Sequence, residues 1–195
     1  TLDDVRIENK LLKTAFEDLP IDLKNAMKIA SSRIKSFHEK QKLSGFEYED
    51  ELGVNLGLKY SPIKRVGFYT PGGKALYPSS VLMNAVPALV AGVEERVLVS
   101  PINLEKSSEI LLAAAYLAEV TEFYRMGGAH AIAALAFGTK DLKKVDKIVG
   151  PGNAYVAEAK RQLFGKVGID SVAGPSEVLV VADKNNNPEW VAIDL

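Results

Sequence analysis

A glycine-rich turn, Gly150-Pro151-Gly152-Asn153, separates a short β-branched run from an amphipathic stretch with helical periodicity. A strand, a tight glycine turn and a helix N-terminus, in this order, hold phosphates and dinucleotides in parallel α/β proteins. The N–H groups of such a turn and the helix dipole face the ligand. A plain structural turn is the other interpretation, because connections of this kind need glycine in any case. The turn by itself leaves both interpretations open.

This turn departs from the dinucleotide fingerprint G-x-G-x-x-G at two positions. Tyr155 occupies the third glycine position, and Pro151 removes one N–H donor. The third glycine normally allows a helix to pack closely on its strand, so Tyr155 predicts a looser or different cofactor pose. Asp170 lies about where the fingerprint places a ribose-binding acid, although a helix and another loop intervene.

Three further turns combine Gly, Pro and small polar residues. They span residues 69–73, 126–130 and 173–176. The first two follow expected strands, as the turn at 150–153 does, whereas the last precedes one. Ligands of open α/β sheets bind beyond the carboxyl ends of the strands. Four such turns around one sheet therefore predict a broad crevice lined by backbone.

The polar side chains of these turns each have a structural and a ligand-binding interpretation. Asn153 is at a helix-cap position, and its amide also suits a ligand hydroxyl or amide. Ser176 fits a local turn hydrogen bond and lacks the context of a nucleophile. His130 stands at a helix start beside the crevice and is a ligand-contact candidate, whereas His38 fits a helix C-terminus. Two isolated histidines and no cysteine leave no zinc-binding spacing in the chain.

The expected secondary structure places these turns around one sheet. Apolar runs predict strands at residues 65–70, 96–100, 122–126, 147–149 and 178–182, and helical periodicity predicts helices at 80–91, 104–118, 129–136 and 154–164. Strand and helix alternate with short connections, and the strands are mostly continuous apolar runs. We therefore predict an α/β fold with a Rossmann-like, doubly wound parallel sheet, formed by residues 63–183.

An N-terminal helical segment, residues 1–62, precedes this domain. A short helix is expected at 7–16, a long amphipathic helix follows it, and residues 52–60 fit a hairpin. The apolar stripe of the long helix consists of Leu23, Met27, Ala30, Ile34 and Phe37. Residues 184–195 are expected to begin a truncated helix that leads into a missing domain, so we expect the chain to be a fragment.

Composition argues against several classes of protein. Lys and Arg total 24 against 25 for Asp and Glu, and the net charge of −1 predicts binding neither to nucleic acid nor to an anionic membrane. The longest apolar stretch, residues 81–93, is interrupted by Asn84 and Pro87 and is too short to span a bilayer. The absence of cysteine excludes disulfides and a thiol nucleophile and fits a cytoplasmic protein.

Four long segments closely resemble the histidinol dehydrogenase family, in the family's order and with compatible spacing. They are R-V-G-F-Y-T-P-G-G-K, M-G-G-A-H-A-I-A-A-L-A-F-G-T, V-D-K-I-V-G-P-G-N-A-Y-V-A-E-A-K-R-Q and D-S-V-A-G-P-S-E-V-L-V-V-A-D. The N-terminal I-K-S-F-H-E-K-Q is similar too, so the resemblance covers nearly the whole chain. It implies Rossmann-like domains in an intertwined homodimer. The implied reaction is the oxidation of L-histidinol to L-histidine through the aldehyde, with two NAD⁺ and a bound zinc.

The resemblance also implies roles for four residues. Tyr69 matches a family tyrosine that contacts NAD, and Asn153 matches the asparagine of the G-P-G-N turn. His130 stands where the family usually carries glutamine, so an imidazole replaces the paired donor and acceptor of an amide. These three are the implied cofactor-binding residues. Ser176 matches a serine that contacts the substrate.

The remaining catalytic groups are implied to lie outside the chain. In the family, a Gln-Ala-Glu-His segment with two zinc ligands follows the V-A-x-D-L that this chain reaches at Leu195. The Glu-His acid–base pair lies further on. We therefore expect no catalytic and no metal-binding residue in this chain, and no activity from it alone. The alternatives are a non-catalytic nucleotide- or metabolite-binding module, and an assembly fragment whose long N-terminal helix packs on a partner.

Overall fold

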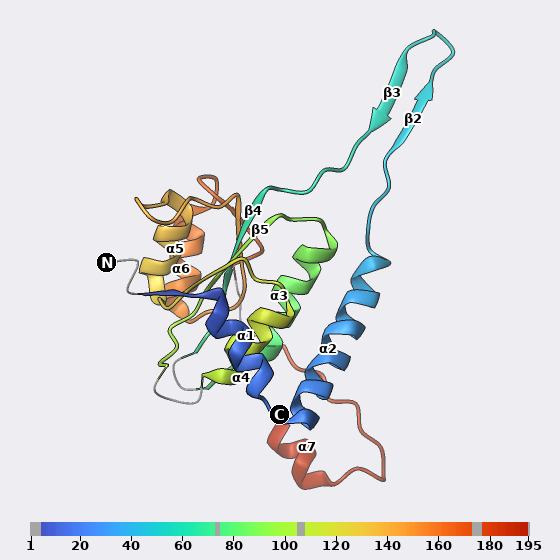
Figure 1. Cartoon of the computed structure of the whole chain (residues 1–195). Helices are drawn as coiled ribbons and strands as arrows, with labels where there is room; N and C mark the ends of the chain where they lie inside the picture. The colour runs from blue at the N-terminus through green and yellow to red at the C-terminus, as the bar shows by residue number, and fades with distance from the viewer. Residues whose placement is uncertain (1–4, 73–74, 105–107, 173–176, 195) are drawn as a thin grey trace.

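The computed structural model describes residues 5–72, 75–104, 108–172 and 177–194. Within these ranges a six-stranded sheet has the order β1-β6-β5-β4-β7-β8 (Figure 1). Its strands are β1 (Arg6–Ile7), β4 (Arg65–Tyr69), β5 (Glu95–Val99), β6 (Glu122–Tyr124), β7 (Lys147–Val149) and β8 (Gly168–Ile169). The pairings from β6 through to β8 are parallel, whereas β1 is antiparallel to β6 at one edge.

The chain builds this sheet outward from β4 in both directions. β5 and β6 follow on one side of β4, and the chain then crosses to the other side to form β7 and β8. The order of the sheet thus reverses between β4 and β7. The α/β class and the doubly wound parallel sheet are confirmed, and open sheets of this kind bind ligands at such a reversal.

Helices cover both faces of the sheet. α3 (Pro78–Val90) and α4 (Glu109–Leu117) pack together, and α5 (Gly128–Phe137) packs on α6 (Ala154–Leu163). Val66 and Phe68 of β4 belong to the hydrophobic core on the α3–α4 face, whereas Tyr69 belongs to the core on the α5–α6 face. Every residue of β4 is buried, as expected for a strand covered on both faces.

Part of the N-terminal segment packs on this sheet. β1 pairs with β6, α1 (Asn9–Asp18) packs on α4, and α2 (Ile21–Glu39) packs on α3. The two helices expected from periodicity are confirmed, whereas β1 is too short to produce a period. The division into residues 1–62, 63–183 and 184–195 stays a prediction.

An antiparallel hairpin projects from the body at the top of Figure 1. It consists of β2 (Phe46–Glu49) and β3 (Asn55–Leu58), and every residue of both strands is exposed. The carboxylate of Asp50 closes the turn by accepting hydrogen bonds from the N–H groups of Leu52 (2.8 Å) and Val54 (2.9 Å). The expectation of a hairpin at 52–60 located the turn and the second strand but missed the first.

The strand predicted at residues 178–182 is wrong. Residues 177–183 pair with no described strand, and Val178, Leu179 and Val181 are exposed. The place beside β7 is occupied by β8, which is too short for the sequence to indicate. An apolar run becomes a strand only where a partner satisfies its N–H and C=O groups. Because β8 pairs with this side of β7, residues 178–182 cannot pair there.

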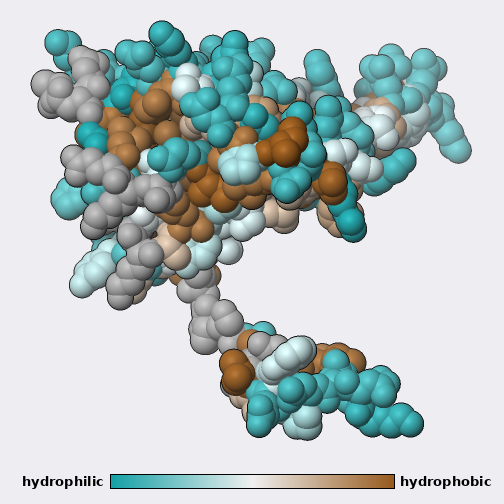
Figure 2. Space-filling view, turned by 60° about the horizontal axis from the view of Figure 1, so that its bottom comes forward, coloured by the Kyte–Doolittle hydropathy of each residue, from teal (hydrophilic) through white to brown (hydrophobic). Residues whose placement is uncertain are grey.

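Apolar side chains also lie exposed outside this run. α7 (Pro188–Asp194) stands apart from the sheet in Figure 1, with Trp190 and Ile193 exposed. Figure 2 shows hydrophobic side chains both on the body and on the small lobe that stands apart from it. Among the helices of the described residues, none has the length and the apolar character needed to cross a membrane.

An ion network joins the amino ends of three neighbouring strands. Arg65 of β4 forms ion pairs with Glu95 of β5 and Glu122 of β6. Glu122 accepts hydrogen bonds from the Arg65 guanidinium at 2.7 and 2.9 Å, and one from the hydroxyl of Tyr124 at 2.8 Å. Burial alone would raise the pKa of Glu122, but these bonds and the charge of Arg65 outweigh burial and hold this pKa below its usual range. Burial, together with Glu122, raises the pKa of Tyr124 to about 12.

We expect this network to make the free energy of unfolding depend on pH through Glu122. A carboxylate whose pKa is lowered by folding contributes its full stabilisation above its unfolded pKa, about 4.3 for glutamate. That contribution is lost as the pH falls through the lower folded pKa. As the pH is lowered, urea unfolding should therefore show a smaller loss of stability in Glu122→Gln than in the unsubstituted protein. Equal losses would show that Glu122 is not the source of this pH dependence.

Candidate functional site

Three of the four glycine-rich turns meet at the carboxyl ends of the parallel strands. They follow the parallel strands β4, β6 and β7. A Cβ atom on Gly127 would lie 2.6 Å from Cβ of Pro101, and one on Gly72 would lie 2.6 Å from Oγ of Ser100. The turns after β4 and β6 thus press against the segment that follows β5. The fourth turn, residues 173–176, lies outside the described residues, and so does Ser176.

Gly150 is held so closely that only glycine fits. Its φ is +111°, and a Cβ atom would lie 2.1 Å from the carbonyl oxygen of Tyr69. Its N–H donates to Oδ2 of Asp170 at 2.8 Å, and its carbonyl accepts from Nζ of Lys160 at 3.1 Å. Both backbone polar groups of Gly150 are therefore used inside the protein, and this N–H does not face a ligand.

The next residues of the turn keep their N–H groups free for a ligand. Pro151 has no N–H, and the N–H groups of Gly152 and Asn153 donate to no protein atom in the described ranges. These two groups precede α6 directly, where the helix dipole presents partial positive charge. The arrangement suits an anion, as a phosphate-binding turn requires.

Asn153 caps α6, as one interpretation of the sequence predicted. Its Oδ1 accepts a hydrogen bond from the N–H of Val156 at 3.1 Å. The side chain is exposed, so its amide nitrogen stands free at the start of the helix. The cap is confirmed, and contact with a cofactor stays a prediction. Tyr155 is 74% exposed, so its ring does not separate α6 from the sheet.

We expect Asn153→Ala to lower the free energy of unfolding by about 1 kcal/mol, because it removes the acceptor of the cap. Asn153→Ser keeps a side-chain oxygen at the same position and is the matched control. Denaturant unfolding of both variants measures the difference. Equal stability of the alanine and serine variants would show that the cap contributes nothing.

Tyr69 lies beneath the turn that presents His130. The Tyr69 side chain is 3% exposed, and its hydroxyl accepts a hydrogen bond from the N–H of Gly128 at 3.1 Å. The hydroxyl proton remains available for donation. His130 is exposed in the first turn of α5, which packs on the helix that Asn153 caps. The structure thus gathers Tyr69, His130 and Asn153 at one edge of the sheet, and their contacts with a cofactor stay predictions.

Two buried hydroxyl groups at this edge have no hydrogen-bond partner among the described residues. They belong to Thr70 and Ser100, which directly follow β4 and β5. Leaving a buried polar group unpaired costs free energy, and such groups are uncommon in folded proteins. Serine and threonine are common at strand ends, so nothing in the sequence marks either residue as part of a site.

A cavity of about 280 Å³ opens beside the Gly150 turn. Its lining includes Asn84 of α3, the backbone of residues 150–152, Lys160 and Asp170. Since Gly150 follows β7 and packs on the end of β4, the cavity lies where the order of the sheet reverses. This is the place at which the sequence predicted a crevice.

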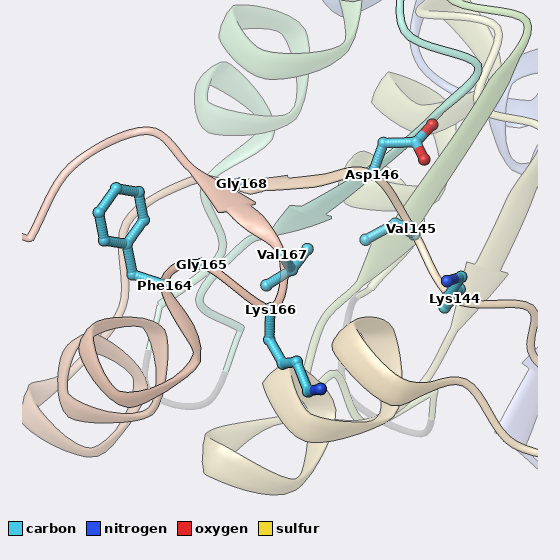
Figure 3. Close-up of a pocket in the computed structure, with 8 residues that line it drawn as sticks. All are labelled: Lys144, Val145, Asp146, Phe164, Gly165, Lys166, Val167 and Gly168. Carbon is cyan, nitrogen blue, oxygen red and sulfur yellow. The ribbon is translucent and has the colours of Figure 1, made fainter.

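A second hollow, of about 270 Å³, lies at the opposite end of the parallel strands, beside the amino end of β7 (Figure 3). Lys144, Asp146 and Lys166 line it together with residues 164–165 and 167–168. Asp146 precedes β7, whereas Gly150 follows it, so the two hollows lie at opposite ends of one strand. Open α/β sheets bind ligands beyond the carboxyl ends of their strands, and the second hollow lies at the amino end of β7, so we do not assign the ligand site there.

Asp170 lines the cavity beside the Gly150 turn and is bonded to three protein groups. It forms an ion pair with Lys160, and it accepts hydrogen bonds from the N–H groups of Gly150 and Ser171, each at 2.8 Å. Burial alone would raise the pKa of Asp170, but these partners hold it below its usual range. Sequence reasoning missed Lys160. The available signal was its place four residues after Val156, on the buried side of α6.

The part of the chain that the structure describes holds no group of three or more His, Cys, Asp or Glu side chains that would bind a metal. The zinc ligands that the resemblance implies lie outside this chain, and this finding does not bear on them. No step of the chemistry is assigned to zinc in this chain.

Comparison with known proteins agrees with this architecture. The family model of histidinol dehydrogenase matches residues 1–195. The chain is 53% identical over 195 residues to histidinol dehydrogenase from Neisseria meningitidis serogroup A, covering all of this chain and 46% of that protein. It is 59% identical over 174 residues to histidinol dehydrogenase 1 from Trichormus variabilis, covering 89% of this chain and 40% of that protein.

A solved structure agrees as well. The crystal structure of histidinol dehydrogenase from Elizabethkingia anophelis superposes with a TM-score of 0.87 at 40% identity, covering 98% of this chain and 45% of that one. The chain spans less than half the length of these relatives. With its full length matched by the family model, the chain belongs to the histidinol dehydrogenase family.

Proposed function

We propose that this chain forms the NAD-binding part of an enzyme that oxidises L-histidinol to L-histidine through the aldehyde, in histidine biosynthesis. The observation that carries the proposal is the turn at residues 150–153. It presents two free N–H groups and a helix N-terminus at the reversal point of the sheet, in a chain of this family. NAD⁺, when bound, would accept a hydride in each oxidation step.

The residues of this chain would bind and orient the cofactor. The N–H groups of Gly152 and Asn153 suit the negatively charged pyrophosphate. The side chains of Asn153 and His130 stand exposed at the starts of two packed helices and suit hydrogen bonds to cofactor hydroxyl or amide groups. Tyr69 supports the start of α5 from beneath and keeps one proton to donate.

Other roles in this proposal rest on the resemblance. Ser176 would contact L-histidinol, and the zinc ligands and the acid–base pair would come from outside this chain. We also propose a cytoplasmic homodimer. Supplied alone with NAD⁺, zinc and L-histidinol, this 195-residue chain is expected to form no NADH. Zinc-dependent turnover by the chain alone would overturn this division of roles.

Calorimetric titration of NAD⁺ into a full-length enzyme that carries this segment tests the proposal. Asn153→Ser keeps the cap but removes the amide, and we expect it to weaken NAD⁺ binding about tenfold, the equivalent of one good hydrogen bond. His130→Gln restores the amide usual in the family and is expected to bind NAD⁺ at least as tightly. Unchanged affinity in Asn153→Ser and in Asn153→Ala would place the cofactor elsewhere.

A further inference from the structure

We propose that Lys160 and Asp170 act as a positioning pair for NAD⁺: by holding Gly150 they fix the turn at residues 150–153 in its binding conformation. The inference rests on the proposed function, since it concerns the same crevice. It assigns a role to two residues that lie 7 and 17 positions after Asn153 in the sequence.

The pair holds Gly150 from both sides. Lys160 reaches back along α6 and donates to the carbonyl of Gly150 at 3.1 Å, while Oδ2 of Asp170 accepts from the Gly150 N–H at 2.8 Å. The two side chains also form an ion pair with each other. Lys160 is 5% exposed, so its bond to the Gly150 carbonyl is buried, whereas the Asp170 side chain keeps 35% of its surface exposed.

These bonds decide which N–H groups the turn presents. Gly150 has no side chain, and its φ of +111° belongs to a region that only glycine adopts readily. Its orientation is therefore set by its two backbone hydrogen bonds. The Gly150 N–H is turned inward and Pro151 has no N–H. The donors that remain in the turn are therefore the N–H groups of Gly152 and Asn153. Loss of the pair would free Gly150 to rotate and would misplace the two donors.

Charge adds to the same requirement. Removing Lys160 alone would leave the carboxylate of Asp170 uncompensated directly behind an anion site, and this charge would repel the pyrophosphate. Removing the charge of Asp170 alone would leave a cation there, which by charge alone would attract it. A purely electrostatic role therefore predicts opposite effects of the two changes on NAD⁺ affinity, whereas a positioning role predicts a loss in both.

Asp170 also links the turn to the next segment. Its Oδ1 accepts from the N–H of Ser171 at 2.8 Å, and Ser171 lies five residues before Ser176 in the sequence. A neighbouring pair on the same helix provides a matched control. Arg161 pairs with Glu158, but both side chains are largely exposed, and neither bonds to the turn.

The test uses a full-length enzyme that carries this segment, with Lys160→Met, Asp170→Asn, the double variant, and Arg161→Met as the control. We expect Kd and KM for NAD⁺ to rise about tenfold in each single variant. The double variant should bind NAD⁺ no more weakly than the weaker-binding single variant, because both changes disrupt the same set of bonds to Gly150. We expect kcat to stay within about twofold, since neither residue touches reacting atoms. Arg161→Met should change none of these.

A loss of thermal stability with unchanged Kd and KM for NAD⁺ would reduce the pair to a structural role and overturn the inference. Tighter binding by Asp170→Asn would overturn it in favour of a simple charge effect. Absence of NAD⁺ binding by the unsubstituted enzyme would instead defeat the proposed function itself, and the inference with it.

Hydrogen exchange of the unsubstituted enzyme without NAD⁺ keeps the inference testable if the variants do not fold. The Gly150 amide should exchange slowly, because it donates to the Asp170 carboxylate, and the Gly152 and Asn153 amides should exchange quickly. Fast exchange at Gly150 would show that the pair does not hold the turn.

Discussion

Gly150→Ala is expected to lower the free energy of unfolding by about 4 kcal/mol and to abolish NAD⁺ binding. Two effects add at this position. The backbone adopts a φ of +111°, which is strained for any residue with a side chain. The new methyl group would also lie 2.1 Å from the carbonyl oxygen of Tyr69, so β7 and β4 would have to move apart. Both the sheet and the turn would then be disturbed.

Gly165→Ala is the matched control for this substitution. Gly165 has a φ of +93°, but a Cβ atom there would meet no atom within 4 Å. It should therefore show only the backbone strain, about 1 kcal/mol, and leave NAD⁺ binding unchanged. Denaturant unfolding and NAD⁺ titration of the two variants measure the difference. Similar stability losses would mean that the contact with Tyr69 is not as close as the structure has it.

Arg65→Met is expected to cost about 3 kcal/mol of stability without directly affecting NAD⁺ affinity. It would leave Glu95 and Glu122 side by side at the amino end of the sheet with no cation between them. The Arg65 side chain is 5% exposed, whereas Glu122 keeps 20% and Glu95 keeps 30%. This partial exposure of the carboxylates places the loss at the lower end of what a broken buried pair costs.

Arg161→Met again provides the control, because its ion pair with Glu158 is exposed and should contribute nothing measurable. Urea unfolding at neutral pH gives the two stabilities, and the loss in Arg65→Met should shrink in acid, where Glu95 and Glu122 become protonated. A loss that does not depend on pH would assign the effect to packing of the arginine stem rather than to charge.

The sequence predicted the main elements of the sheet because they are long and uniformly apolar. β4 and β5 are buried on both faces, and the helices between the strands have clear periodicity. The prediction failed where local pattern does not decide the structure. β1 and β8 are two residues each, and the apolar run at 178–182 finds no partner among the described strands. Strand formation depends on which edge is open, and one segment of sequence carries no information about that.

In the candidate site, too, features with a local sequence signature could be predicted, whereas features that depend on long-range contacts could not. Asn153 was identified because a cap has a local signature, and the structure confirms the cap. The meeting of three glycine turns followed from the order of strands and helices. Lys160 could not be recognised with the same ease, because its partner Asp170 is joined to it only through the fold. The inward direction of the Gly150 N–H likewise depends on this long-range contact.

Hydrogen exchange with and without NAD⁺, measured on a full-length enzyme that carries this segment, tests the location of the site most directly. Bound NAD⁺ is expected to slow exchange at Gly152 and Asn153 and at the first turn of α5 around His130. The amide of Gly150 should be slow in both states. Protection confined to residues 144–146 and 164–168, around the hollow beside the amino end of β7, would contradict the account.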